Sequence, residues 1–185
     1  TGAPEDTAVL LTMGKTMPQL TPENSMERLE KAQQLYLQFG YTTVQDGRSD
    51  MGAIASAMAL AESGRLVVDV VSYPDILKLG EGALPNHLQF SRSYKNHFRI
   101  GGVKLTLDGS PQGKTAWLSE PYLQPPEGQK PGYRGYGVLS DARANEEVAK
   151  AIRNGWPILV HGNGDAAIDQ FIAAVRASGP VEQAR

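Results

Sequence analysis

Stretches with the pattern of a buried strand alternate with stretches with the pattern of an amphipathic helix along most of this chain. Strands are predicted at 42–44, 66–71, 102–107 and 157–160. In the second of these the apolar residues are nearly continuous, which is typical of a parallel strand covered on both faces. Because strand–helix alternation favours a parallel sheet with crossover helices, the sequence predicts an α/β fold with four parallel strands adjacent in chain order.

Helices are predicted at 22–39, 50–63 and 141–153, and a fourth begins at 163–165. Thr21 and Ser140 suit the N-cap position, and glycines follow the first three helices. Helical spacing predicts the buried faces: Leu29, Ala32, Tyr36 and Phe39; Ile54, Met58 and Ala61; Val148, Ala151 and Ile152; and Ile168, Phe171, Ile172 and Val175.

Two stretches lack such patterns. Residues 73–98 are predicted to be irregular apart from a helical turn at 75–79. Residues 110–137 form a long loop rich in Pro and Gly, and a loop of this length is typically functional or disordered. Its aromatic residues Trp117, Tyr122 and Tyr133 either shape a substrate pocket or hold the loop in place.

Polar residues follow the predicted strands, at the edge where parallel sheets carry their sites: Asp46, Asp108, His161 and Asp165. His161 is the leading candidate, because an imidazole at a strand end can bind a metal; the alternative is a histidine that packs and bonds a loop. Asp46 and Asp108 precede glycines and predict turns. Asp165 is expected in the first turn of the last helix, where the helix dipole favours a carboxylate that can also cap the helix. His87 and His97 are weaker candidates.

Lys104 lies between Val103 and Leu105 in a predicted strand, so it should face away from its two neighbours. A buried lysine needs a partner or a changed charge state. Carbamylation by carbon dioxide would turn the amine into a carboxylate that can bridge two cations. The alternative is a lysine that extends to solvent or pairs with an acid.

Composition excludes several classes of protein. The net charge of −2 and the absence of a basic cluster speak against a nucleic-acid partner, and no apolar run is long enough for a membrane helix. Without cysteine there can be no disulfide or thiolate site. The first seven residues do not resemble a signal peptide, so we expect a cytoplasmic location and leave a periplasmic one open.

Three motifs resemble the amidohydrolase 3 group of the amidohydrolase superfamily, with its YtcJ-like and N-substituted formamide deformylase-like members. The first is Gly-Gly-Val-Lys-Leu-Thr-Leu-Asp-Gly-Ser at 101–110, followed by Gln-Gly-Lys-Thr-Ala at 112–116 and Glu-Pro-Tyr at 120–122. The second is His-Gly-Asn-Gly-Asp at 161–165, and the third is Gly-Tyr-Thr-Thr-Val-Gln-Asp at 40–46. Their order and spacing agree with the group over about residues 20–178.

The resemblance implies a (β/α)₈ barrel enzyme that uses a metal-activated water to hydrolyse an amide or related non-peptide C–N bond of a small molecule. His161 would be the metal-binding histidine of the fifth strand, and Lys104 the fourth-strand lysine that is carbamylated in binuclear sites. The implied cofactor is a divalent metal, with zinc expected.

The sequence departs from the family pattern in what it lacks. It contains no His-x-His pair of a first strand, no sixth-strand histidine and no eighth-strand aspartate. We therefore expect 1–185 to be a single partial barrel domain with strands 2–5, without strand 1 and strands 6–8. With 185 residues it is shorter than the roughly 250 of a complete barrel. We expect it to be inactive alone, to bind metal weakly or not at all, and to form a homo-oligomer through its open sheet edges.

Two alternatives stay open at this point. One is a non-catalytic binding or regulatory module that retains part of the amidohydrolase fold. The other is an unrelated doubly wound α/β protein without a metal.

Overall fold

The computed structural model describes residues 12–13, 15–16, 21–79 and 89–179. The chain forms two compact units. The α2–α3 unit comprises Gln19–Lys104 and Trp156–Leu159, and the α4–α5 unit is built on Leu105–Gly155 and Val160–Arg185. None of the helices in the described ranges is both long and apolar enough to cross a membrane.

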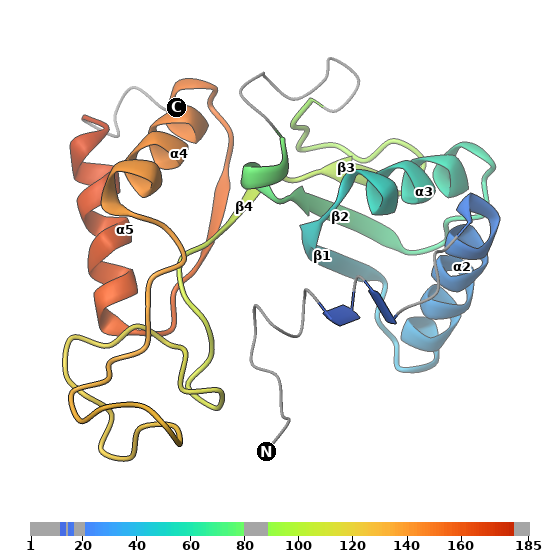
Figure 1. Cartoon of the computed structure of the whole chain (residues 1–185). Coiled ribbons are helices and arrows are strands. Elements are labelled where there is room, and N and C mark those ends of the chain that lie inside the picture. The colour runs from blue at the N-terminus through green and yellow to red at the C-terminus, as the bar shows by residue number, and fades with distance from the viewer. Residues whose placement is uncertain (1–11, 14, 17–20, 80–88, 180–185) are drawn as a thin grey trace. The chain divides into compact units, whose positions relative to one another are not determined.

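The α2–α3 unit combines a parallel sheet with two helices that lie side by side (Figure 1). Three strands follow one another across this sheet in the order β1-β2-β3. The elements are α2 (Pro22–Gln38), β1 (Thr43–Ser49), α3 (Met51–Glu62), β2 (Asp69–Pro74), a 3₁₀ turn (Ile76–Lys78) and β3 (Phe98–Ile100).

Strands β4 (Val103–Thr106) and β5 (Ile158–His161) pair with each other, and both pass from the α2–α3 unit into the α4–α5 unit. The backbone N–H of Val103 donates to Pro157 O at 2.8 Å, and that of Leu107 donates to His161 O at 2.9 Å. The residue numbers advance together, so the two strands are parallel. A parallel bridge between Asp75 and Lys104 links the end of β2 to β4. The strands of each sheet are thus parallel and in chain order, as predicted, but they form two sheets rather than one sheet of four strands.

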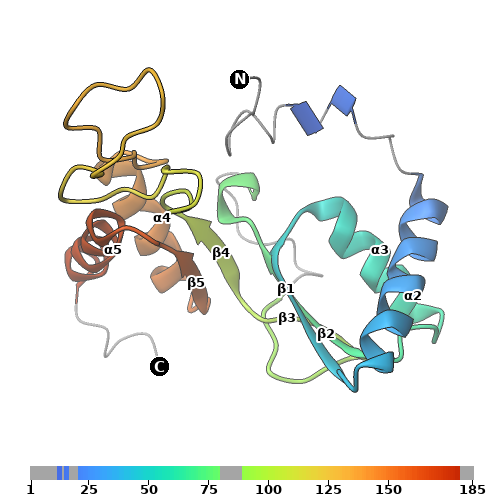
Figure 2. The ribbon, with the colours of Figure 1, turned by 90° about the horizontal axis from the view of Figure 1, so that it is seen from below.

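The α4–α5 unit contains α4 (Asp141–Arg153) and α5 (Asp165–Ala177), which pack side by side (Figure 2). The two predicted N-caps, Thr21 and Ser140, are confirmed. The Thr21 hydroxyl accepts from the N–H of Asn24 at the start of α2, and the Ser140 hydroxyl accepts from the N–H of Arg143 at the start of α4.

Asp46 and Gly47 do not form the predicted turn, and that prediction is wrong. Strand β1 continues through them to Ser49, with Asp46 paired to Ser72 and Ser49 paired to Pro74. One more residue lies on β1 than on β2 between these pairs, which is a β-bulge. An Asp-Gly pair suits a bulge as well as a turn, because both need an irregular backbone.

Strand β3 was missing from the predicted elements, because three residues are too few for a periodic pattern. Gly101 and Gly102 separate it from β4. At Gly102, φ is +153°, and a Cβ would lie 2.1 Å from Pro157 O. Only glycine therefore lets the start of β5 approach so closely at this point.

The predicted buried faces of two helices need correction. In α5 the buried residues are Ala167, Gln170 and Ala174, while Ile168 and Ile172 are 45% and 41% exposed. Gln170 can be buried because its amide nitrogen donates to Leu139 O and to the Asp141 carboxylate, at 3.1 and 2.8 Å.

In α2, Leu29 and Ala32 line a cavity of about 610 Å³ over the sheet, but Tyr36 and Phe39 of the predicted stripe are exposed. Phe39 is the C-cap residue of α2, where the chain leaves the helical path, so helical spacing no longer sets its direction.

Gln33 is the buried residue of α2, with 2% of its surface exposed. Its amide nitrogen donates to Arg65 O, and its amide oxygen accepts from the N–H of Val67, both at 2.8 Å. One side chain thereby satisfies two backbone groups in the connection from α3 to β2.

We predict that Gln33→Leu lowers the free energy of unfolding by about 2 kcal/mol, because two backbone groups lose their partner. Gln34→Leu, at the exposed neighbouring position, should change it by less than about 0.5 kcal/mol. Urea unfolding followed by circular dichroism measures both. Equal effects at the two positions would contradict this role for Gln33.

Candidate functional site

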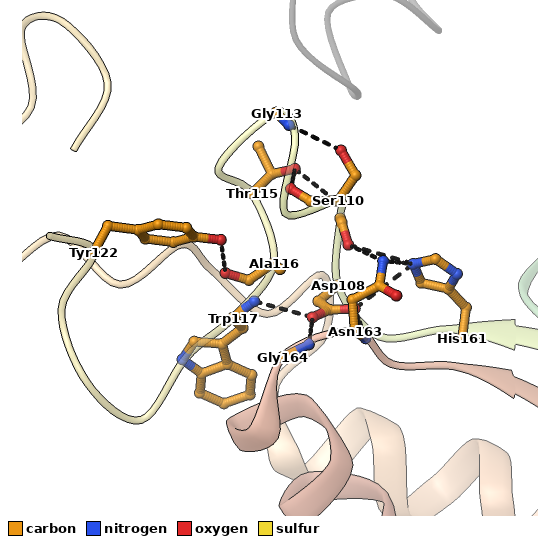
Figure 3. Close-up of polar contacts among 11 residues, drawn as sticks. Asp108, Ser110, Gly113, Thr115, Ala116, Trp117, Tyr122, His161, Asn163 and Gly164 are labelled. Carbon is orange, nitrogen blue, oxygen red and sulfur yellow. Dashed lines mark hydrogen bonds and ion pairs between the residues drawn. The ribbon is translucent and has the colours of Figure 1, made fainter. Parts of the chain in front are cut away.

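The carboxylate of Asp108, just after β4, is buried and accepts three backbone N–H groups (Figure 3). Its Oδ2 accepts from Gly164 at 2.7 Å and Trp117 at 2.9 Å, and its Oδ1 accepts from Asn163 at 2.9 Å. The predicted turn at Asp108 is therefore wrong. Asp108 instead joins the end of β4 to the long loop and to the start of α5.

His161 is the last residue of β5, as predicted, and its side chain is 36% exposed. Its Nε2 lies 3.1 Å from Asn163 Nδ2, 3.3 Å from Gly109 O and 3.7 Å from Asp108 Oδ1 (Figure 3). Asn163 Nδ2 also donates to Gly109 O at 2.9 Å. The imidazole Nε2 thus lies among an amide, a backbone carbonyl and a carboxylate oxygen, and the side chain of Asn163 contacts both the ring and Gly109.

Asp165, the first residue of α5, holds the long loop. Its carboxylate accepts from the N–H of Ser119 at 2.8 Å and from the Ser119 hydroxyl. These bonds, the hydroxyl first, lower the pKa of Asp165 below its ordinary value. The N-cap residue is Gly164, without a side-chain cap, and a Cβ there would lie 1.8 Å from Trp117 O. Asp165 thus lies in the first turn of α5 as predicted, and its main partner is Ser119 in the long loop.

The aromatic residues of the long loop hold it in place, which was one of the two roles considered for them. The hydroxyl of Tyr122 donates to Ala116 O at 2.9 Å, and the rings of Tyr122 and Tyr133 lie 5.9 Å apart. The Trp117 ring lies against Gly137, where a Cβ would come within 2.8 Å of it. The loop is thus ordered by its own contacts as well as by Asp108 and Asp165.

Lys104 lies in the α2–α3 unit and is half-buried, between the fully buried Val103 and Leu105. This is the alternation that its strand pattern predicted. Burial, and then the charge of Arg48, lower the pKa of the Lys104 amine below its ordinary value, while the Asp75 carboxylate opposes them. Neither Arg48 nor Asp75 stood out in the sequence as a candidate, although Asp75 directly follows a strand.

The remaining histidines add no support for a metal role. His97 Nδ1 lies 2.8 Å from an oxygen of Asp69 on the surface, an arrangement that accounts for this side chain without a metal. His87 lies outside the described residues.

Within the described ranges, no three His, Cys, Asp or Glu side chains gather in a way that could hold a metal ion. His161 offers one imidazole in the α4–α5 unit, and Lys104 offers one amine in the α2–α3 unit. Because a zinc site takes several protein ligands, these residues do not complete one. The metal roles of Lys104 and His161, and the convergence of their side chains, stay predictions.

We predict that Asp108→Asn lowers the free energy of unfolding by about 2–3 kcal/mol, because an amide NH₂ would face a backbone N–H that the carboxylate now accepts. Asp169→Asn on an exposed position of α5 should have little effect. Denaturant unfolding measures the difference, and equal stability of the two variants would refute the anchoring role of Asp108.

The contact of Asp165 with Ser119 should depend on pH. Because the folded pKa of Asp165 lies below its ordinary value of 3.8, the contact stabilises the chain above that value. That stabilisation is lost as the pH falls through the lowered folded pKa. An NMR titration of the Ser119 amide should show this transition, and Ser119→Ala should raise the pKa of Asp165. Ser178→Ala, at the other end of α5, should leave it unchanged; a pKa unaffected by Ser119→Ala would contradict the assignment.

The amidohydrolase family model matches residues 3–184. YtcJ of Bacillus subtilis (strain 168), a protein assigned to the amidohydrolases, is 30% identical over 84 residues, or 45% of this chain and 15% of YtcJ. The exoenzymes regulatory protein AepA of Pectobacterium carotovorum subsp. carotovorum is 26% identical over 162 residues, or 84% of this chain and 33% of AepA.

Two solved structures of uncharacterized metal-dependent hydrolases share the fold. The protein from Pyrococcus horikoshii OT3 has a TM-score of 0.71 at 24% identity, over 94% of this chain and 34% of that protein. The protein from Pyrococcus furiosus has a TM-score of 0.70 at 26% identity, over 93% and 35%. The chain thus spans about a third of the length of AepA and of both hydrolases.

These matches confirm the predicted fold class, an α/β fold that corresponds to part of a (β/α)₈ barrel. The family match covers nearly the whole sequence, including the stretches around Lys104, Asp108 and His161 that carried the resemblance. The chain belongs to the amidohydrolase family.

Proposed function

We propose that this chain is part of a metal-dependent hydrolase that cleaves an amide or related non-peptide C–N bond of a small molecule. Family membership and the likeness to two metal-dependent hydrolases support a hydrolase of this type. The observation that carries the proposal is the position of His161, which ends β5 with its ring held by Asn163 beside Gly109.

In the complete enzyme we assign His161 and Lys104 to the metal site, with zinc as the metal and with Lys104 carbamylated if the site is binuclear. A divalent metal supplies an activated water and polarises the carbonyl that the water attacks. The part played by this chain is orientation. Asn163 fixes the imidazole ring, and Asp108 fixes the backbone of Asn163.

We further propose that the chain alone does not turn over substrate, since the described residues do not complete a metal site. Its metal affinity should be weak, and it should form a homo-oligomer. A cytoplasmic location and the absence of nucleic-acid and membrane partners are part of the same proposal, on the grounds of composition alone.

A non-catalytic regulatory module is the second candidate. The relative aligned over 84% of this chain, AepA, is named as a regulatory protein. The two candidates differ in one respect: a hydrolase needs His161 as a metal ligand, and a regulatory module does not.

Zinc titration tests the assignment of His161. The chain has three histidines, so their ring signals can be followed by NMR. We expect zinc to shift the His161 signals, and His161→Ala to weaken binding about tenfold or more. His97→Ala is the matched control and should leave binding at His161 unchanged. Equal zinc affinity of His161→Ala and the wild type would contradict the assignment.

Turnover tests whether the chain is complete as an enzyme. We expect no significant zinc-dependent hydrolysis of formamides or other simple amides. Zinc-dependent hydrolysis that disappears in His161→Ala would overturn the view that further ligands are needed.

A further inference from the structure

The bulge in β1 redirects the side chain of Arg48. In a regular strand, Arg48 would face the same side as Val44 and Asp46, which line the cavity beneath α2. The extra residue between Asp46 and Ser49 breaks this alternation, and Arg48 is not among the residues around that cavity. Bulges that redirect a side chain are common beside active sites.

Asp75 holds the guanidinium of Arg48 in place. Its Oδ2 accepts from Arg48 Nε at 2.9 Å, and its Oδ1 accepts from the N–H of Leu77 at 3.1 Å. The side chain of Asp75 is only 3% exposed. Its backbone is held on both sides, because its N–H donates to Ser49 O at 3.0 Å and it bridges to Lys104. Arg48 is therefore anchored to a rigid point between strand ends.

The rest of the Arg48 guanidinium has no partner among the residues that the structure describes. Its side chain is 43% exposed, and its Nη1 and Nη2 make no hydrogen bond or ion pair with any other described residue. With Nε bound to Asp75, Nη1 and Nη2 are the two nitrogens left for a ligand, and they form a planar fork. Such a fork matches the two oxygens of a carboxylate.

The shape of the guanidinium favours a carboxylate as the ligand, because two nitrogens of one planar group match the two oxygens of one carboxylate. The neighbouring acids make other contacts: Asp46 Oδ1 lies 3.5 Å from the Arg48 backbone nitrogen, and Asp50 caps α3.

We propose that Arg48, held by Asp75 at the carboxyl ends of β1 and β2, is a binding site for a carboxylate group. In the hydrolase this would be a carboxylate of the substrate, and Arg48 would select anionic substrates over neutral amides. The assignment to a substrate carboxylate rests on the proposed function, whereas the binding of a carboxylate by Arg48 does not.

The test uses the ¹⁵N-labelled chain, with acetate as the probe and acetamide as its neutral counterpart. At constant ionic strength, acetate should shift the Arg48 Nε–Hε signal and the amides of Ser49 and Leu77 in a saturable way. Acetamide and chloride should not. Arg48→Gln should weaken acetate binding about tenfold or more, as read from the Ser49 and Leu77 amides.

Arg48→Lys keeps a positive charge beside the buried Asp75 and removes only the paired Nη atoms. It therefore tests the role of these two nitrogens even if Arg48→Gln does not fold. It should also weaken acetate binding. Arg65→Gln is the matched control, because Arg65 already uses its Nε and Nη2 on the carboxylate of Glu30. Equal shifts by acetate and chloride, or wild-type binding by Arg48→Lys, would overturn the proposal. None of these measurements involves a metal or turnover, so the hydrolase proposal can fail without affecting them.

Discussion

The buried carboxylate of Asp108 is the interaction on which the candidate site depends. A charged group without solvent must have its hydrogen bonds supplied by the protein, and here three backbone N–H groups supply them. Those groups come from the long loop and from the segment between β5 and α5. The loop, the strand end and the helix start are therefore held at one point, and the ring of His161 lies beside it.

The same principle orders the α2–α3 unit, where buried polar side chains hold irregular backbone. Gln33 satisfies two backbone groups between α3 and β2, and Asp75 holds both Leu77 and the guanidinium of Arg48. Gln33 does so from within α2, whereas Asp75 directly follows the last residue of β2. Loops at the carboxyl ends of parallel strands are where such folds carry their sites, so their rigidity has functional value.

The elements that could be predicted correctly from the sequence are those with strong periodicity or clear caps. The helix at 141–153 was predicted to the residue, because Ser140 and Gly155 mark its ends. The buried side of α5 could not be predicted from its apolar residues, because Gln170 finds its partners on Leu139 and Asp141, far away in the sequence. Asp108 was misread for the same reason: an Asp-Gly pair indicates a turn locally, whereas its partners at 117 and 163–164 appear only in the fold. His161, by contrast, was found from its place at a strand end.

Hydrogen exchange of the three amides bound by Asp108 tests this account most directly. The amides of Trp117, Asn163 and Gly164 belong to no regular helix or strand bonding pattern, so their protection depends on the Asp108 carboxylate. If Asp108 joins the three segments, all three amides exchange slowly and with similar rates, close to those of the α5 interior. Exchange as fast as that of the exposed loop residue Gly128 would show that the segments move independently, and it would contradict a fixed position for His161.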